Sequence, residues 1–196
     1  MIDLTSTPII ILVILGSVGV ALPVVSIALK ERPSMISYGI ATLIALFASI
    51  GYVLYQLALD HVAPAAIFSQ DVLVDDAFGS LFAIAMLIVA IFTTVGSFSY
   101  MKNKANPSVY FSLILLSAIG MVLVAYATDL VMLFVAWELM SIPTYILVGF
   151  LKKDPISNEA AIKYFLFGAL SSAIIIYGIS LAYGITGSTN IGEVIQ

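Results

Sequence analysis

Glu138 is the residue of this sequence whose type and position point most directly to chemistry. It lies inside the apolar run 134–143, which reads FVAWELMSIP, nine positions after Asp129. At about 1.5 Å per helical residue, the carboxyl is roughly 13–14 Å from Asp129, near the middle of a bilayer. A charge at that depth costs roughly 2.5–3.5 kcal/mol, and a carboxyl avoids part of that cost by binding a proton. We therefore expect a proton relay at Glu138; a structural hydrogen bond to a neighbouring helix is the alternative.

Three residues close to Glu138 in sequence are candidates for supporting this role. Pro143 has no N–H to donate to the carbonyl of Leu139, so this carbonyl is free one turn from the acid. Ser141 and Tyr145 follow Glu138 at i+3 and i+7, roughly on the same helix face. We expect these groups to hold water beside the carboxyl, whereas an ordinary helix kink is the alternative explanation for Pro143.

Lys163 is the second candidate, as a further relay group or a structural one. Glu159 precedes it by four positions, a spacing that stabilises a helix start by about 0.2–0.5 kcal/mol. We expect Lys163 about one turn inside its helix, where its long side chain can also extend to the membrane surface. A direct ion pair between Lys163 and Glu138 is too long without water. Gly168 and Ser172, four apart, predict a face for close helix packing.

The composition determines what kind of molecule holds these residues. Of the 196 residues, 62% are apolar and 9% are charged, against roughly 45–50% and 25% in soluble domains. An all-α integral membrane protein is therefore expected. The sequence has no cysteine and one histidine, His61, so it offers no disulfide and no obvious ligands for a metal or redox cofactor. No cofactor is expected in this chain, and the lack of a basic run argues against a nucleic-acid partner.

About six transmembrane helices are predicted from apolar stretches of roughly 20 residues. Pro107 and Pro155 are expected in the connections between them. Residues 1–107 would hold the first three helices and 108–196 the other three. The connection 60–76 carries the alternation Asp71-Val-Leu-Val-Asp75, which predicts a short hairpin. The six predicted spans are Pro8–Leu29, Ile36–Leu59, Ala77–Phe98, Ser108–Ala127, Leu130–Leu151 and Ala160–Gly184.

The distribution of charge predicts the orientation of these helices. Basic residues gather in the connections after spans one, three and five, or just beyond, and the positive-inside rule places those connections in the cytoplasm. The basic residues are Lys30, Arg32, Lys102, Lys104, Lys152, Lys153 and Lys163. The opposite side carries acids and no base, namely Asp3, Asp60, Asp71, Asp75, Asp76, Asp129 and Glu193. A multi-pass chain with both termini outside the cell membrane of a prokaryote is expected.

Two blocks of sequence carry a family resemblance. The first contains Glu138-Leu-Met-Ser141 and continues through IPTYILVGF; the second is EAAIKYF at 159–165, followed by LFGALSS. Over roughly residues 108–190 the chain resembles the antiporter-like membrane-arm subunits of the respiratory complex I superfamily. The resemblance is greatest to subunit N of NADH:quinone oxidoreductase and of archaeal F420H2 dehydrogenase.

The resemblance implies a non-redox, proton-translocating subunit of a quinone- or phenazine-reducing dehydrogenase. Its partners would be other membrane-arm subunits and the lipid bilayer, and its enzymatic role that of a translocase subunit. Glu138 matches the family's fifth-helix glutamate, which pairs with a lysine on the seventh helix and controls its proton loading. Lys163 matches the lysine of the sixth-helix block. The redox chemistry would take place in other subunits.

The chain departs from the family in extent. Family members contain two inverted repeats of helices, whereas this sequence matches the N-terminal portion and reaches only part of the first repeat. A fragment, a split gene product and a truncated chain all remain possible explanations. Two other functions remain open: a subunit of a multi-subunit sodium/proton antiporter, and a truncated scaffold piece that does not pump.

Overall fold

Six long apolar helices make up most of the computed structural model, which describes residues 6–29, 34–59, 65–66 and 72–195. Each helix is long and apolar enough to cross a membrane. This confirms the prediction of an all-α integral membrane protein with about six transmembrane helices. The helices are α1 (Thr7–Ala28), α2 (Met35–Ala58), α3 (Ala77–Tyr100), α4 (Pro107–Tyr126), α5 (Leu130–Val148) and α6 (Pro155–Thr186).

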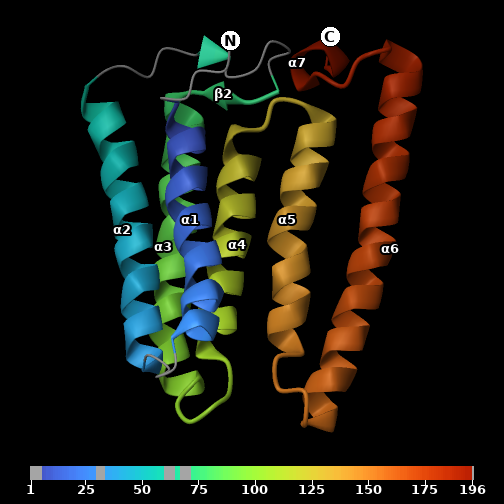
Figure 1. Ribbon diagram of the computed structural model, residues 1–196. Coiled ribbons are helices and arrows are strands. Elements are labelled where there is room, and N and C mark those ends of the chain that lie inside the picture. Colours follow the sequence, from blue (N-terminus) through green and yellow to red (C-terminus); the bar gives the residue numbers. More distant parts are fainter. Residues whose placement is uncertain (1–5, 30–33, 60–64, 67–71, 196) are drawn as a thin grey trace.

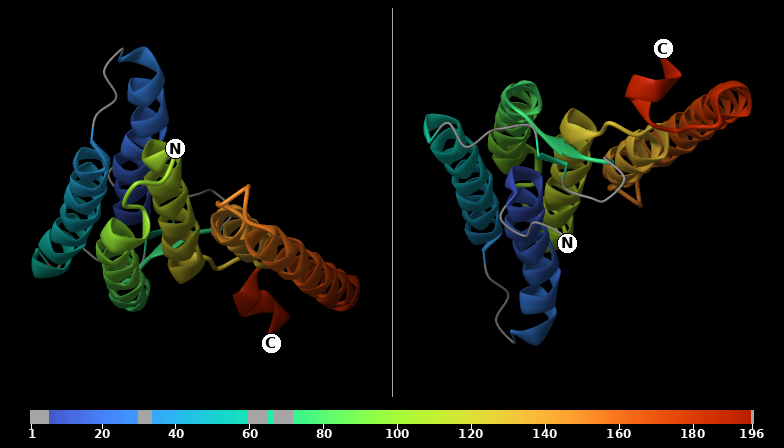
Figure 2. Two further views of the ribbon diagram at one scale, coloured as in Figure 1. Left: turned by 90° about the horizontal axis from the view of Figure 1, so that it is seen from below. Right: turned by 90° about the horizontal axis from the view of Figure 1, so that it is seen from above.

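The helices run up and down in alternation, with α2 at one edge of the bundle and α6 at the other (Figure 1). α4 lies at the centre and packs against α1, α3 and α5, and 61% of its most apolar segment is buried. α6 packs against α5 and lies away from α1 to α4 in both views along the bundle (Figure 2). The core therefore surrounds α4, and the far face of α6 is uncovered.

Aspartates define the starts of three helices. Each of these side chains accepts a hydrogen bond from a backbone N–H in the first turn of the helix that follows; they are Asp76, Asp129 and Asp154. These bonds satisfy N–H groups that have no partner within the helix. Pro155 comes directly after the last of these caps and is the first residue of α6. The prediction that Pro155 lies in a connection and that the sixth helix begins at Ala160 was therefore wrong. The same holds for Pro107, which was expected in a connection but is the first residue of α4. A proline fits the first helical position because its missing N–H would have no helical partner there.

α4 and α5 approach each other backbone to backbone. A Cβ added to Gly120 would lie 2.7 Å from the Cα of Met140 and 2.8 Å from the carbonyl oxygen of Ala136. The hydroxyl of Ser117, one turn earlier on α4, donates to the Met140 carbonyl at 3.0 Å. Glycine at 120 is therefore needed for α5 to lie this close to the centre of the bundle.

Extended segments cross one end of the bundle. β1 (Ala65–Ala66) pairs antiparallel with β2 (Val74–Asp75), which confirms the hairpin predicted in 60–76; residues 60–64 and 67–71 lie outside the described ranges. Further bridges join Leu73 to Ala127 and Asp129 to Asn190. We call segments 72–75, 127–129 and 188–191 the extended layer. The short helix α7 (Ile191–Val194) follows it, and both chain ends lie on this side (Figure 1).

Candidate functional site

Glu138 lies near the centre of α5, as the ninth of its 19 residues. Across the six membrane-spanning helices, it is the charged residue nearest the middle of a helix; the other two, Glu159 and Lys163, lie in the first turns of α6. The Glu138 side chain is partly buried and faces α6, where the hydroxyl of Ser172 donates a hydrogen bond to its Oε1. Among the residues that the structure describes, the carboxyl thus has a hydroxyl partner on the neighbouring helix.

The face of α6 next to Glu138 is built from small residues. Gly168 has no room for a Cβ, which would overlap the ring and hydroxyl of Tyr145 on α5. Tyr145 also packs edge-on against Tyr164 and Phe165, with ring centroids 4.9 and 6.0 Å away. This close contact agrees with the packing face predicted for Gly168 and Ser172. Tyr145 and Glu138 therefore both point toward α6.

Ser141 is differently placed. Its hydroxyl is buried and donates to the carbonyl of Trp137 at 2.7 Å, and Thr144 in turn donates to the carbonyl of Ser141 at 2.7 Å. Both bonds stay within α5, on either side of the buried Pro143. Ser141 therefore contributes its hydroxyl to the backbone around the proline. The expectation that Pro143, Ser141 and Tyr145 hold water beside Glu138 stays a prediction.

Lys163 forms the predicted pair with Glu159, at 2.5 Å, and both side chains are 66% exposed. Two residues earlier, Ala161 lies against Gly149 just beyond the end of α5, so Lys163 is close to that end of the bundle. Nine residues separate Lys163 from Ser172, which corresponds to about 13–14 Å along a helix. Lys163 and Glu138 therefore lie at different depths, as expected, and do not form a direct ion pair.

Two polar contacts of this region were not predicted. Ser172 was predicted only as a small residue that allows close helix packing, but its hydroxyl also donates a hydrogen bond to Glu138. Asp129 caps α5 with one carboxylate oxygen. Its other carboxylate oxygen accepts a hydrogen bond from the hydroxyl of Thr189, at 2.5 Å. The backbone N–H of Leu130 donates to the Thr189 carbonyl at 2.8 Å. The start of α5 is thus fixed to the segment after α6, and α5 is held both at its first residues and at its centre.

Within the described ranges, no group of three or more histidine, aspartate or glutamate side chains could hold a metal ion. The site is accordingly a carboxyl–hydroxyl pair between two apolar helices. A carboxyl can take up or release a proton, and a hydroxyl both donates and accepts hydrogen bonds. The chemistry available to this arrangement is proton transfer.

The segment that holds this carboxyl–hydroxyl pair is similar to known proteins. Residues 127–196, which include all of α5 and α6, match the family described as NADH:quinone oxidoreductase/Mrp antiporter, TM. The chain is 48% identical over 123 residues to NADH-quinone oxidoreductase subunit N 1 of Koribacter versatilis, covering 62% of this chain and 24% of the relative. It is 38% identical over 130 residues to F(420)H(2) dehydrogenase subunit N of Methanosarcina mazei, covering 66% and 26%.

The fold has a counterpart in a solved respiratory complex. Respiratory complex I from Thermus thermophilus, solved with bound aureothin, contains a chain that matches with a TM-score of 0.74 and 30% identity. The match covers 93% of this chain and 38% of that one. The chain therefore spans roughly a quarter to two fifths of the length of these relatives. The resemblance to antiporter-like subunit N seen in the sequence is confirmed over this part.

Proposed function

We propose that the chain is part of a non-redox, proton-translocating membrane subunit of a quinone- or phenazine-reducing respiratory dehydrogenase, with Glu138 in the proton path. The observation that carries the proposal is the carboxyl of Glu138 at mid-helix, bound to a hydroxyl on α6. Intramembrane acids facing a helix bundle mark ion pathways more often than not. The similarity to subunits N of two kinds of dehydrogenase supports the choice of complex.

The proton step follows from the hydrogen bond. With Glu138 ionised, Ser172 donates its O–H to the carboxylate; with Glu138 protonated, the carboxyl itself becomes a donor and the serine oxygen can accept. The two charge states therefore favour different hydrogen-bond directions across the α5–α6 contact. A proton arriving at or leaving the carboxyl would reverse this bond. We assign Lys163 a position near the membrane surface, as a relay or structural group at the entrance.

The test is proton pumping by the complete membrane complex carrying Glu138→Gln. Glutamine keeps the size and hydrogen-bonding capacity of the side chain but cannot release a proton at neutral pH. We expect electron transfer to persist while the number of protons moved per electron falls. Glu193→Gln, which removes an acid from α7, is the control and should keep the ratio unchanged. An unchanged ratio in Glu138→Gln, with the complex fully assembled, would contradict the proposal and favour a scaffold role.

A sodium/proton antiporter subunit is the second candidate, because the matching family description includes the Mrp antiporter. The two functions differ in what drives the ion movement. An antiporter exchanges ions when a sodium gradient is imposed without any electron donor, whereas a dehydrogenase subunit moves protons only during electron transfer. Measuring both in vesicles that contain the complete complex separates the two candidates.

A further inference from the structure

Lysine side chains line a cleft at the end of the bundle opposite the extended layer. The cleft has a volume of about 760 Å³ and lies between segment 104–109, where α4 begins, and segment 146–154, where α5 ends. Lys104, Lys152 and Lys153 all line it, against one acid, Asp154. In the described part of the chain, none of these lysines forms an ion pair; Lys104 lies over the ring of Tyr100, 3.3 Å from its centroid. We call this the lysine cleft.

The start of α4 adds to the positive character of the lysine cleft. Asn106, which also lines the cleft, precedes α4 in a left-handed conformation (φ 57°, ψ 49°), and its side chain makes no capping hydrogen bond. Pro107 has no N–H to offer, so the first backbone donors of α4 belong to Ser108 and Val109; Val109 lines the lysine cleft, whereas Ser108 lines a second cleft beside it. A helix start with free N–H groups favours an anion. Asp154, by contrast, uses a carboxylate oxygen to cap α6, at 3.1 Å from the N–H of Ile156.

The remaining lining of the lysine cleft is apolar. Val109 on α4 and Ile146 on α5 are 41% and 50% exposed, and Phe150 lies between the two helices, with its ring 5.1 Å from that of Tyr110. Val109 and Ile146 lie within the membrane-spanning helices, and the lysines lie in the connections beyond them. The cleft thus offers cations at the membrane surface and a hydrocarbon-like groove below them.

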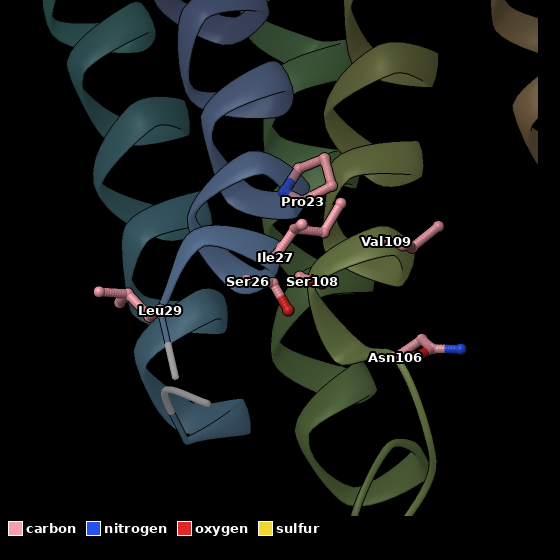
Figure 3. Close-up of a pocket in the computed structure, with 7 residues that line it drawn as sticks. All are labelled: Pro23, Ser26, Ile27, Leu29, Asn106, Ser108 and Val109. Carbon is pink, nitrogen blue, oxygen red and sulfur yellow. The ribbon is translucent and has the colours of Figure 1, made fainter. Parts of the chain in front are cut away.

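A neighbouring cleft of about 550 Å³, between the end of α1 and the start of α4, provides the contrast. Its described lining contains no charged side chain (Figure 3). In Figure 3, Asn106 and Val109 extend from α4 on the side away from Leu29, and both also line the lysine cleft. The two clefts share one wall and lie at the same membrane depth. They differ in charge.

We infer that the lysine cleft binds an anionic phospholipid. The phosphate of the head group would lie among Lys104, Lys152 and Lys153, and an acyl chain would lie along Val109 and Ile146. Basic pockets between transmembrane helices on the cytoplasmic side bind acidic head groups in this way. The predicted orientation places this end of the bundle in the cytoplasm. This inference is independent of the role proposed for Glu138.

The test uses the complete membrane complex in nanodiscs with photoreactive phosphatidylglycerol, followed by identification of the labelled peptides. We expect labelling of segments 104–109 and 146–154. Lys104→Gln should lower this labelling about fivefold, since one lysine near an anionic surface contributes about that factor in binding. Lys102→Gln is the matched control: it removes one charge from the same connection, outside the cleft, and should leave labelling within about twofold.

Three results would overturn the inference. Equal loss of labelling in Lys104→Gln and Lys102→Gln would mean general attraction to the membrane surface. Equal labelling by photoreactive phosphatidylcholine would mean that charge plays no part. Absence of label from both segments would mean that protein covers the cleft in the complex. The comparison of the two lipids uses the unaltered protein, so it decides the question even if a lysine variant fails to assemble.

Discussion

At the residue scale, the Glu138–Ser172 contact combines two properties that a proton site needs. The carboxyl belongs to the ninth of the 19 residues of α5, far from both helix ends, and it has a polar partner. A hydrogen bond to a charged acceptor contributes about 1.5–3 kcal/mol, about twice as much as a bond between neutral groups. Ser172 therefore gives the acid a hydrogen-bond partner on the neighbouring helix.

Ser172→Ala is expected to slow proton movement through the complex roughly tenfold, because the carboxylate loses about 1.5 kcal/mol or more of stabilisation. The measurement is the initial rate of proton release per electron transferred. Ser171→Ala is the matched control, since the Ser171 hydroxyl is exposed and donates to the carbonyl of Phe167 in its own helix. If both alanine variants behave alike, Ser172 is not a partner of the acid in the working complex.

The sequence was sufficient to locate Glu138 but not its partner. An acid in an apolar run is visible from one segment alone, because hydropathy and helical rise give its depth. Ser172 is 34 positions away, and its contact depends on how α6 lies along α5, which hydropathy does not determine. For the same reason the hydroxyl of Ser141 could be placed on α5 but its bond to Trp137 could not be foreseen.

At the element scale, the position of α5 is set from both sides. Gly120 of α4 allows the backbone of α5 to approach, and the small residues of α6 allow contact on the opposite side. Because Glu138 lies between Ala136 and Met140, the two residues nearest Gly120, any displacement of α5 there would move the carboxyl. Close packing around a glycine thus positions the carboxyl of Glu138 without contacting it.

Gly120→Ala is expected to destabilise the protein by about 1–3 kcal/mol, since the new methyl group would meet the α5 backbone, which cannot rotate away. The measurement is the thermal unfolding of the purified complex, monitored as the fraction of this subunit that dissociates at each temperature. Gly96→Ala on α3 is the control, because a Cβ there meets nothing within 4 Å. It should be neutral or stabilising by up to about 1 kcal/mol, as alanine favours helices. Equal stability of the two variants would contradict the close contact.

Thr189→Val is expected to release the segment after α6 from the start of α5. Valine keeps the shape of threonine but cannot donate to the Asp129 carboxylate, so about 1.5–3 kcal/mol should be lost. Hydrogen exchange of residues 187–195 should become faster. Thr93→Val on α3, whose hydroxyl bonds within its own helix, should leave this exchange unchanged. Unchanged exchange in Thr189→Val would show that the backbone bonds of the extended layer suffice.

The helix boundaries show where hydropathy stops being informative. The six helices were predictable because apolar runs and charged connections alternate along the whole chain. The first turns of α6 were missed because Ser157, Asn158 and Glu159 are polar, although Asp154 and Pro155 favour a helix start there. Of the extended layer, only the hairpin was predicted from the sequence; its bridges to segments 127–129 and 188–191 were not. The hydrogen bond from Thr189 to Asp129 and the backbone bridge that pairs Asp129 with Asn190 join segments some 60 positions apart, and no local pattern reveals them.

At the scale of the whole molecule, the two ends of the bundle differ in charge and in structure. The extended layer ties α1, α5 and the segment after α6 together at one end; the backbone N–H of Thr7, for example, donates to Asp75 at 2.7 Å. In the described part of the chain, the other end has two lysine-bearing connections, 101–106 and 149–154, and the lysine cleft. We therefore expect the lysine end to face the cytoplasm.

Labelling of single cysteines tests this orientation, since the 196 residues contain no native cysteine. Lys102→Cys should react with a membrane-impermeant maleimide only when the cytoplasmic side is accessible. Glu193→Cys, on α7 at the other end, should react in intact cells. The opposite pattern would reverse the assignment of both termini to the outside and would place the lysine cleft in the outer leaflet.

The length of α6 links the site to the thickness of the bilayer. α6 has 32 residues, about 48 Å of helix, whereas the 19 residues of α5 make about 28 Å and nearly match a hydrocarbon layer of about 30 Å. Between the contacts Gly149–Ala161 and Asp129–Thr189, the chain covers 20 positions on the α5 side. On the α6 side it covers 28 positions, of which the last three lie beyond the end of the helix at Thr186. α6 therefore leans away from α5, as Figure 1 shows.

A helix longer than the hydrocarbon layer adjusts to it by tilting. A thicker membrane would bring α6 more upright and a thinner one would lean it further. Ser172 lies on α6 and Glu138 on the nearly matched α5, so hydrophobic mismatch would act directly on the hydrogen bond between them. The acyl-chain length of the surrounding lipid would thus change how closely Ser172 approaches the carboxyl of Glu138.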